Sequence, residues 1–261
     1  MTDALIGNTG FVGGTLLRQR QFDELYRSTN IDKIAGRSFD TVVCAGAPAQ
    51  KWLANREPEA DRRKIDGLIG HLSSISCSTF ILISTVDVFM HALAVDEDSA
   101  PDEQQLHAYG LNRLRLEKFA QSQFSRCLVV RLPGLVGPGL RKNVIYDFLN
   151  DNNLHAVESR SVFQFYPMVN LWADLQLALE RDLRLLHLTA EPISVADVAR
   201  HGFGKSFDNV LPATPASYDF RSRHAALFGG VGSYQYSKRE TLQAVRAYAQ
   251  SEPRALKQGA T

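Results

Sequence analysis

Three glycines near the start of the chain, Gly7, Gly10 and Gly13, have a spacing that can bind phosphate. They lie in the stretch GNTGFVG, which follows the short apolar run 4–6 and precedes a segment of helical periodicity, 11–20. A glycine turn lets the backbone approach a ligand closely, and the N-terminus of the next helix offers free N–H groups and a partial positive charge. The pattern therefore indicates a site for the pyrophosphate of a dinucleotide. The alternative is a tight turn with a purely structural role.

Strand-like and helical segments alternate after this turn. Strands are predicted at 4–6, 25–28, 40–45, 79–84 and 127–132, and helices at 11–20, 58–74 and 109–124. The strands are apolar almost throughout, which is typical of a sheet covered on both faces. Helices between strands indicate parallel βαβ units. We therefore expect an α/β protein with a doubly wound parallel sheet of the Rossmann type.

The pattern changes after the loop signal Gly137-Pro138-Gly139. We expect residues 1–140 to form the dinucleotide-binding core. Residues 141–261 are expected to be a mixed α/β region that partly completes the core and partly forms a small substrate-binding lobe. Within this region we predict helices at 143–150, 171–181 and 237–250, strands at 162–165 and 185–188, an irregular stretch at 203–233 and a frayed tail at 251–261.

Composition excludes several classes of function. The chain of 261 residues has 29 basic and 28 acidic residues, so its net charge of +1 gives no electrostatic reason to bind nucleic acid or an anionic membrane. Its three cysteines and seven histidines have no metal-site spacing, so we expect no metal. No apolar run is long enough to span a bilayer, and the N-terminus enters a strand at once. We therefore expect a cytoplasmic protein without nucleic-acid or membrane partners.

The second predicted strand bears on which dinucleotide binds. An acidic residue at its end would hold the adenine ribose hydroxyls of NAD. The chain instead has Arg27 and Ser28 there, whereas Asp32 lies past the strand. An arginine and hydroxyls suit a 2′-phosphate, so the cofactor is NADP or NAD, with NADP favoured. The alternative for Arg27 is a solvated side chain.

Five motifs follow one another along the chain: GNTGFVG, VVCAGAP, LISTVDVF, YGLNR and VVRLPGLVGPG. Together, in this order, they resemble the extended short-chain dehydrogenases/reductases. Within that family the similarity is to the NAD(P)-dependent epimerase/dehydratase group acting on nucleotide sugars, including the sugar-nucleotide reductases. The resemblance covers residues 3–140 and is thin beyond them.

The resemblance implies a catalytic set. In this family a Ser or Thr at the end of the fourth strand binds the reacting oxygen, and a Tyr-x-x-x-Lys pair lies on the next helix. The tyrosine exchanges a proton with the substrate hydroxyl while hydride moves to or from the nicotinamide. The lysine holds the ribose and lowers the tyrosine pKa. The matching positions are Thr85, Tyr109 and Arg113.

Arg113 departs from the family pattern. Four-residue spacing puts Tyr109 and Arg113 on one helix face, but a forked guanidinium is not equivalent to an ammonium. Two functions therefore stay open: an enzyme with Tyr109 as acid/base, or a dinucleotide-binding sensor or scaffold that has lost catalysis. Without a role in a site, Tyr109 would anchor its helix as a half-buried aromatic and Arg113 would be a surface partner of Glu117.

The resemblance also implies contacts along the cofactor, a small-molecule substrate that is a nucleotide sugar, and a homodimer. The expected cofactor contacts are Gly7, Asn8, Thr9, Gly10, Phe11, Val12, Gly13, Arg27, Ser28, Ala45, Gly46, Ala47, Ser84, Tyr109, Arg113 and Pro133.

Two residues of the second half are expected to bind the substrate, Asn143 and Gln164. Asn143 opens a predicted helix, so helix capping is the alternative. Gln164 lies in the aromatic run FQFY, where the family often has an arginine-containing segment that grips a diphosphate. Here the run has no arginine, Arg160 lies upstream, and core packing is the alternative.

Overall fold

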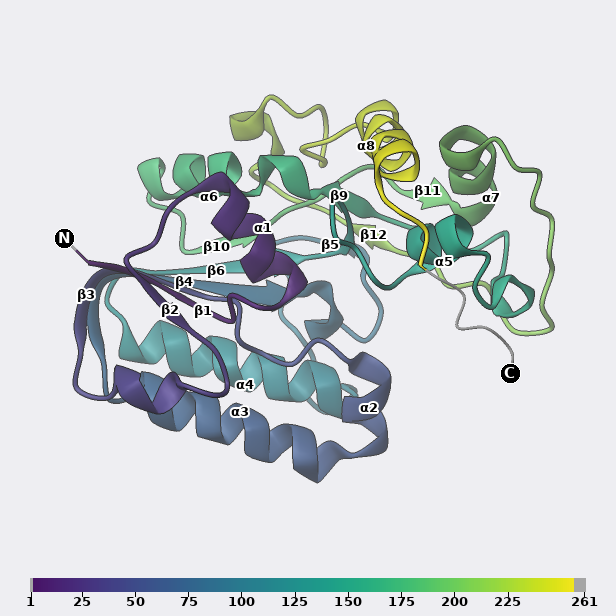
Figure 1. Cartoon of the computed structure of the whole chain (residues 1–261). Helices are drawn as coiled ribbons and strands as arrows, with labels where there is room; N and C mark the ends of the chain where they lie inside the picture. Colours follow the sequence, from purple (N-terminus) through teal and green to yellow (C-terminus); the bar gives the residue numbers. More distant parts are fainter. Residues whose placement is uncertain (1, 256–261) are drawn as a thin grey trace.

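A six-stranded sheet lies at the centre of the computed structural model, which describes residues 2–255 (Figure 1). Neighbouring strands are all parallel, in the order β10-β6-β4-β3-β1-β2. The chain adds β2 on one side of β1 and then β3 on the other, so the winding reverses between β1 and β3. The strands are β1 (Asp3–Ile6), β2 (Glu24–Tyr26), β3 (Ser38–Cys44), β4 (Ser76–Thr85), β6 (Cys127–Leu132) and β10 (Leu185–His187).

Helices cover both faces of this sheet, as the apolar strands require. All six residues of β6 are buried, so neither of its faces meets solvent. Figure 1 shows α3 and α4 below the sheet and α1 and α6 above it. The predicted doubly wound α/β fold is confirmed. The covering helices are α1 (Phe11–Gln19), α3 (Pro58–Leu72), α4 (Ala108–Gln123) and α6 (Leu171–Glu180).

Each sheet face has its own hydrophobic core. Ile65 of α3 and Leu116 of α4 pack against alternate strand residues such as Leu82. On the opposite face, Leu16 of α1 and Leu175 of α6 pack in the second core cluster. Helix spacing and the two-residue period of the strands together produce this division.

The part of the chain after β6 contributes β10 and α6 to the main sheet and also forms small sheets outside it. In these small sheets, β7 pairs in parallel with β9, and β8 pairs antiparallel with β11. A further parallel pair joins β5 with β12. These elements are β5 (Leu93–Val95), β7 (Gly134–Val136), β8 (Val162–Phe163), β9 (Phe165–Pro167), β11 (Ile193–Ser194), β12 (Asp219–Phe220), α5 (Val144–Asn150), α7 (Val195–Asp197) and α8 (Lys238–Ser251).

Local structure differs from the sequence prediction at α2 and at residues 162–165. A short helix, α2 (Lys51–Arg56), precedes α3 and was not expected. The single strand expected at 162–165 is two strands, β8 and β9, because the chain turns from one partner strand to another at Gln164. Most of the tail expected at 251–261 lies outside the described residues. No helix within residues 2–255 is long and apolar enough to cross a membrane.

Candidate active site

The glycine turn joins β1 to α1 and packs against the end of β3. Gly7 has φ +86°, and a Cβ there would lie 2.4 Å from the carbonyl oxygen of Ala45. A Cβ on Gly13 would lie 2.2 Å from the carbonyl oxygen of Gly7. Both clashes are with backbone, so neither position accepts a side chain. At Gly10 a Cβ would make only an ordinary contact, 3.5 Å from the Gly7 oxygen.

The turn has features that fit a ligand. No side chain of the described residues caps α1 at Gly10, and Gly10, Phe11 and Val12 line a cavity. The uncapped N–H groups of the first turn are therefore available to an anion. The Asn8 Oδ1 atom is buried and accepts no hydrogen bond within residues 2–255. A dinucleotide pyrophosphate fits this turn, because such a group needs backbone donors and close approach.

A cavity of about 1040 Å³ lies at the carboxyl ends of β1, β3, β4 and β6. Ligand crevices of doubly wound sheets occur at this edge, where the winding reverses. Among the residues expected to form the site, Asn8 and Gly13 do not line the cavity and lie in the turn itself. Those that line it are Gly7, Thr9, Gly10, Phe11, Val12, Arg27, Ser28, Ala45, Gly46, Ala47, Ser84, Thr85, Tyr109, Arg113, Pro133, Asn143 and Gln164.

Positive charge gathers where β2 ends. Arg27 and Ser28 line the cavity directly after β2, whereas Asp32 is exposed in the following turn. Lys64 and His71, seven residues apart on one face of α3, also line the cavity. The α3 helix packs on the turn that holds Asp32, so Lys64 and His71 border the same region. Basic and hydroxyl groups line the cavity here, and the one carboxylate among the described lining residues, Asp87, belongs to the segment after β4.

The first turn of α4 fixes the position of Tyr109. The Tyr109 N–H donates to Asn55 Oδ1 at 3.0 Å, and His107 caps the helix by accepting from the Gly110 N–H at 3.0 Å. A Cβ on Gly110 would lie 2.1 Å from the Asp87 carbonyl oxygen. The glycine therefore lets α4 approach the segment after β4 closely, which brings Tyr109 beside Thr85. His107 serves as a cap here.

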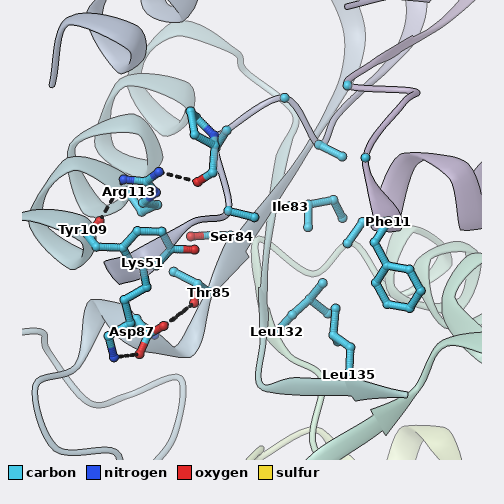
Figure 2. A pocket seen from close by; sticks show the side chains of 18 of the residues that line it. Phe11, Lys51, Ile83, Ser84, Thr85, Asp87, Tyr109, Arg113, Leu132 and Leu135 are labelled. Carbon is cyan, nitrogen blue, oxygen red and sulfur yellow. Dashed lines mark hydrogen bonds and ion pairs between the residues drawn. The ribbon is translucent and has the colours of Figure 1, made fainter. Parts of the chain in front are cut away.

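Lys51, Thr85 and Asp87 lie with Tyr109 on one side of the cavity, opposite the apolar Leu135 (Figure 2). Lys51 Nζ donates to Asp87 Oδ1 at 2.7 Å. The Thr85 hydroxyl lies 3.4 Å from Asp87 Oδ2 and accepts from the Asp87 N–H at 3.1 Å. The sequence analysis did not select Lys51 or Asp87.

Arg113 is buried and already paired. Its guanidinium forms an ion pair with Asp61, including a 2.9 Å bond from Nη2 to Oδ1, and also donates to the Pro48 carbonyl. Its carbon Cζ lies 3.9 Å from the centre of the Tyr109 ring. The alternative of a surface partner of Glu117 is wrong, because Arg113 is 2 % exposed and Glu117 pairs with Arg131 instead.

Ionisation of Tyr109 responds to opposing influences. Burial raises the pKa of the Tyr109 phenol above its ordinary value, and the Asp87 carboxylate raises that pKa further. Arg113, Lys51 and the Thr85 hydroxyl lower it. Desolvation is the largest effect, so the cations beside the ring offset only part of it. Burial is the largest single influence on the pKa of Lys51 and lowers it, but Asp87, Tyr218 and Tyr109 together raise this pKa above its ordinary value.

A buried polar chain extends from the cavity wall into the sheet. Ser84, which lines the cavity, donates to Glu117 at 2.5 Å. Glu117 accepts from Arg131 Nη2 at 2.7 Å, and Arg131 Nη1 lies 3.2 Å from His187 Nε2. Ser84 is thus occupied with Glu117, and Thr85 is the hydroxyl that stands beside Tyr109.

Residues of the second half close the cavity. Asn143, with φ +77°, caps α5 by accepting from the Ile145 N–H at 2.9 Å. The Gln164 amide donates to the carbonyls of Ala190 and Phe220, each at 2.7 Å, and accepts from the Phe220 N–H at 2.7 Å. The amide oxygen and nitrogen of Gln164 are therefore occupied by bonds to the backbone that forms the cavity wall. Binding a substrate through this amide would require these backbone bonds to break.

Lys142 is a basic residue of the second half that lines the cavity, whereas the run FQFY contributes no basic side chain. Arg160 does not line the cavity and pairs with Glu158. Lys142 lines the cavity and donates from Nζ to the Ala49 carbonyl at 2.6 Å, and burial lowers the pKa of its ammonium. No ion pair of Lys142 with a carboxylate occurs within the described part of the chain.

Solved structures of sugar-nucleotide enzymes have the same architecture. A dTDP-4-dehydrorhamnose reductase from Clostridium acetobutylicum superposes with a TM-score of 0.74 at 16 % identity, covering 96 % of this chain and 99 % of that one. RMD from Pseudomonas aeruginosa, complexed with NADPH, gives 0.73 at 16 % identity, with coverages of 96 % and 99 %. The UDP-glucose 4-epimerase of Thermotoga maritima, solved with UDP-glucose, gives 0.71 at 15 % identity, with coverages of 96 % and 99 %.

The chain has the fold of these reductases and epimerases. The five sequence motifs resemble the same group, so the fold that the resemblance implied is confirmed. No family model matches the sequence, and no curated protein matches it. The similarity between this chain and the solved structures is therefore a similarity of fold.

Several residues of the site were not selected from the sequence, among them Lys51, Lys64, Asp61, Asp87 and Gly110. Asp87 and Gly110 could have been selected from the sequence, because Asp87 lies two residues after Thr85 and Gly110 directly follows Tyr109. The others come from segments whose approach to the cavity depends on tertiary packing. Within residues 2–255, no group of three or more His, Cys, Asp or Glu side chains could hold a metal ion.

Proposed function

We propose that the protein is an NAD(P)-dependent oxidoreductase, epimerase or dehydratase of the extended short-chain type, acting on a nucleotide-activated sugar. The observation that carries the proposal is the shared cavity. Tyr109 and Thr85 line the same cavity as the glycine turn, on a sheet with the fold of sugar-nucleotide reductases and epimerases.

The glycine turn and the α1 N-terminus would hold the pyrophosphate, with Arg27 toward the adenosine. When bound, the nicotinamide supplies hydride exchange with a carbon atom of the substrate. Arg27, Ser28 and Lys64 support NADP as the favoured cofactor, because they offer cations and a hydroxyl to a 2′-phosphate. RMD of Pseudomonas aeruginosa was solved with NADPH, which agrees with this choice.

Tyr109 would be the acid/base. Its hydroxyl would give a proton to the reacting oxygen of the substrate or take one from it, and Thr85 would hydrogen-bond the same oxygen. Burial raises the pKa of Tyr109, which favours the phenol as proton donor and suits the reductive direction. Arg113, stacked on the ring and held by Asp61, would keep the ring in place.

An anionic substrate is supported by Lys142. This ammonium lines the cavity next to Asn143, and no carboxylate of the described residues pairs with it. A diphosphate could take the place of the Ala49 carbonyl as its partner. The proposed substrate is therefore a nucleotide sugar, and the proposed setting is a cytoplasmic homodimer, as the family resemblance implies.

The experiment is a turnover assay with a matched variant. The purified protein is incubated with NADPH or NADH and a panel of nucleotide sugars and their 4-keto derivatives, and cofactor oxidation and sugar products are followed. Tyr109→Phe should abolish turnover and leave cofactor affinity within about threefold, because only the hydroxyl is removed. Cofactor binding without turnover across the panel would favour a sensor or scaffold. Absence of cofactor binding would overturn both functions.

A further inference from the structure

We infer that the Lys51–Asp87 ion pair, which lies in the same cavity as Tyr109, adjusts the ionisation of Tyr109. This inference rests on the proposed role of Tyr109 as acid/base. In the motif of the family the cation beside the tyrosine is the lysine four residues after it. Here that position is Arg113, which is buried and paired with Asp61, and the structure adds a second, more exposed cation from α2, far away in the sequence.

Arg113 lacks the freedom that this task requires. Its guanidinium is 2 % exposed, both of its Nη atoms bond to Asp61, and one also bonds to the Pro48 carbonyl. The carboxylate of Asp61, itself 5 % exposed, neutralises this charge at close range. Arg113 therefore acts on Tyr109 as a fixed cation, which stacks on the ring and lowers the pKa of the phenol.

Lys51 has the exposure that Arg113 lacks. Its side chain is 40 % exposed and lines the cavity together with Tyr109 and Thr85. Figure 2 shows Lys51 extending from the Tyr109 side toward Asp87. A substrate or ribose hydroxyl entering the cavity can therefore reach its ammonium group.

Asp87 makes the arrangement adjustable. It is the only carboxylate among the described residues that line the cavity. One of its oxygens accepts from Lys51 at 2.7 Å, and the other lies 3.4 Å from the Thr85 hydroxyl. Lys51 favours a negative phenolate and Asp87 opposes it, so each offsets the effect of the other while they stay paired.

Removing the Lys51 ammonium should therefore raise the pKa of Tyr109, and removing the Asp87 carboxylate should lower it. The other charged and titratable groups near the tyrosine, or near the Lys51–Asp87 pair, are unchanged in such variants. They are Arg113 and Asp61 behind the ring, His107 at the start of α4, Lys142 across the cavity and Tyr218.

The test is a titration of Tyr109 alone. A fluorinated tyrosine, whose phenol ionises nearer to neutral pH, is incorporated at position 109, and its ¹⁹F resonance is followed against pH. Lys51→Met should raise the midpoint by about one pH unit, and Asp87→Asn should lower it by a similar amount. The double variant Lys51→Met/Asp87→Asn should return close to the parent, and Lys51→Arg should stay there.

Lys118→Met is the matched control, because it breaks a lysine–carboxylate pair with Glu103 outside the cavity. Its midpoint should not move. Thermal unfolding of each variant checks that the fold is kept. Equal midpoints in Lys51→Met and the parent, or shifts of the same sign in Lys51→Met and Asp87→Asn, would overturn the inference. The titration needs neither substrate nor cofactor, so its result is independent of the turnover assay.

Discussion

The guanidinium carbon of Arg113 lies 3.9 Å from the centre of the Tyr109 ring, and Asp61 holds it there. The pair therefore fixes one face of the tyrosine and ties α3 to α4. A buried cation of this kind is stable only with its counter-charge present.

Replacing Asp61 with alanine should destabilise the protein strongly. The change leaves the Arg113 guanidinium buried without a carboxylate, which costs about 3–5 kcal/mol in the free energy of unfolding. Urea denaturation at neutral pH measures the loss. Glu103→Ala, which breaks the exposed pair with Lys118, should cost less than about 1 kcal/mol. Similar losses in both variants would contradict the burial argument.

Replacing Gly7 with alanine should damage the cofactor site. The new Cβ would lie 2.4 Å from the Ala45 carbonyl oxygen, and φ +86° disfavours any side chain. We expect NADPH affinity to fall more than about tenfold, measured by quenching of protein fluorescence. Gly14→Ala is the control, because nothing lies within 4 Å of a Cβ there. It should keep the affinity and stabilise α1 by up to about 1 kcal/mol. An unchanged affinity in Gly7→Ala would exclude the turn as the pyrophosphate site.

Replacing Arg27 with alanine should reduce discrimination between the two cofactors. If Arg27 binds a 2′-phosphate, NADPH should bind about tenfold more weakly and NADH almost as before. Competitive titrations with both cofactors give the ratio. Lys33→Ala removes an exposed cation that does not line the cavity and should leave both affinities unchanged. An equal loss of affinity for NADPH and NADH would indicate that Arg27 contacts a part that the two cofactors share.

Stability should fall in mild acid because of His187. Burial and Arg131 lower the pKa of this imidazole from 6.5 to about 3. Below pH 6.5 the unfolded chain gains a proton that the folded state cannot take up, so stability decreases as the pH falls toward 3. Between pH 7 and 5 the loss from this group is about 2 kcal/mol.

His187→Phe should remove that component of the pH dependence, although the loss of the bond to Arg131 lowers stability at neutral pH. Urea midpoints at pH 7 and 5 give the difference for each protein. His91→Phe, at an exposed position, should retain the full acid sensitivity. If His187→Phe loses as much stability as the parent between these two pH values, another group is responsible.

The sequence by itself determined the layers of the fold and the edge where the cavity lies. Uninterrupted apolar strands such as 127–132 demand cover on both faces, and periodic helices between strands demand parallel connections. A glycine turn after the first strand then defines one end of the crevice. Tyr109 and Thr85 were selected because the motifs in which they lie resemble those of a known family, and both line the cavity.

Tertiary structure alone decided which charges meet. Arg113 pairs with Asp61 rather than with Glu117, although Glu117 lies one helical turn away. Lys51 reaches Asp87 across 36 positions of sequence. Helix spacing describes neighbours on one element only, whereas burial selects partners from whichever elements pack together. The ionic environment of Tyr109 is therefore a property of the packed sheet and helices.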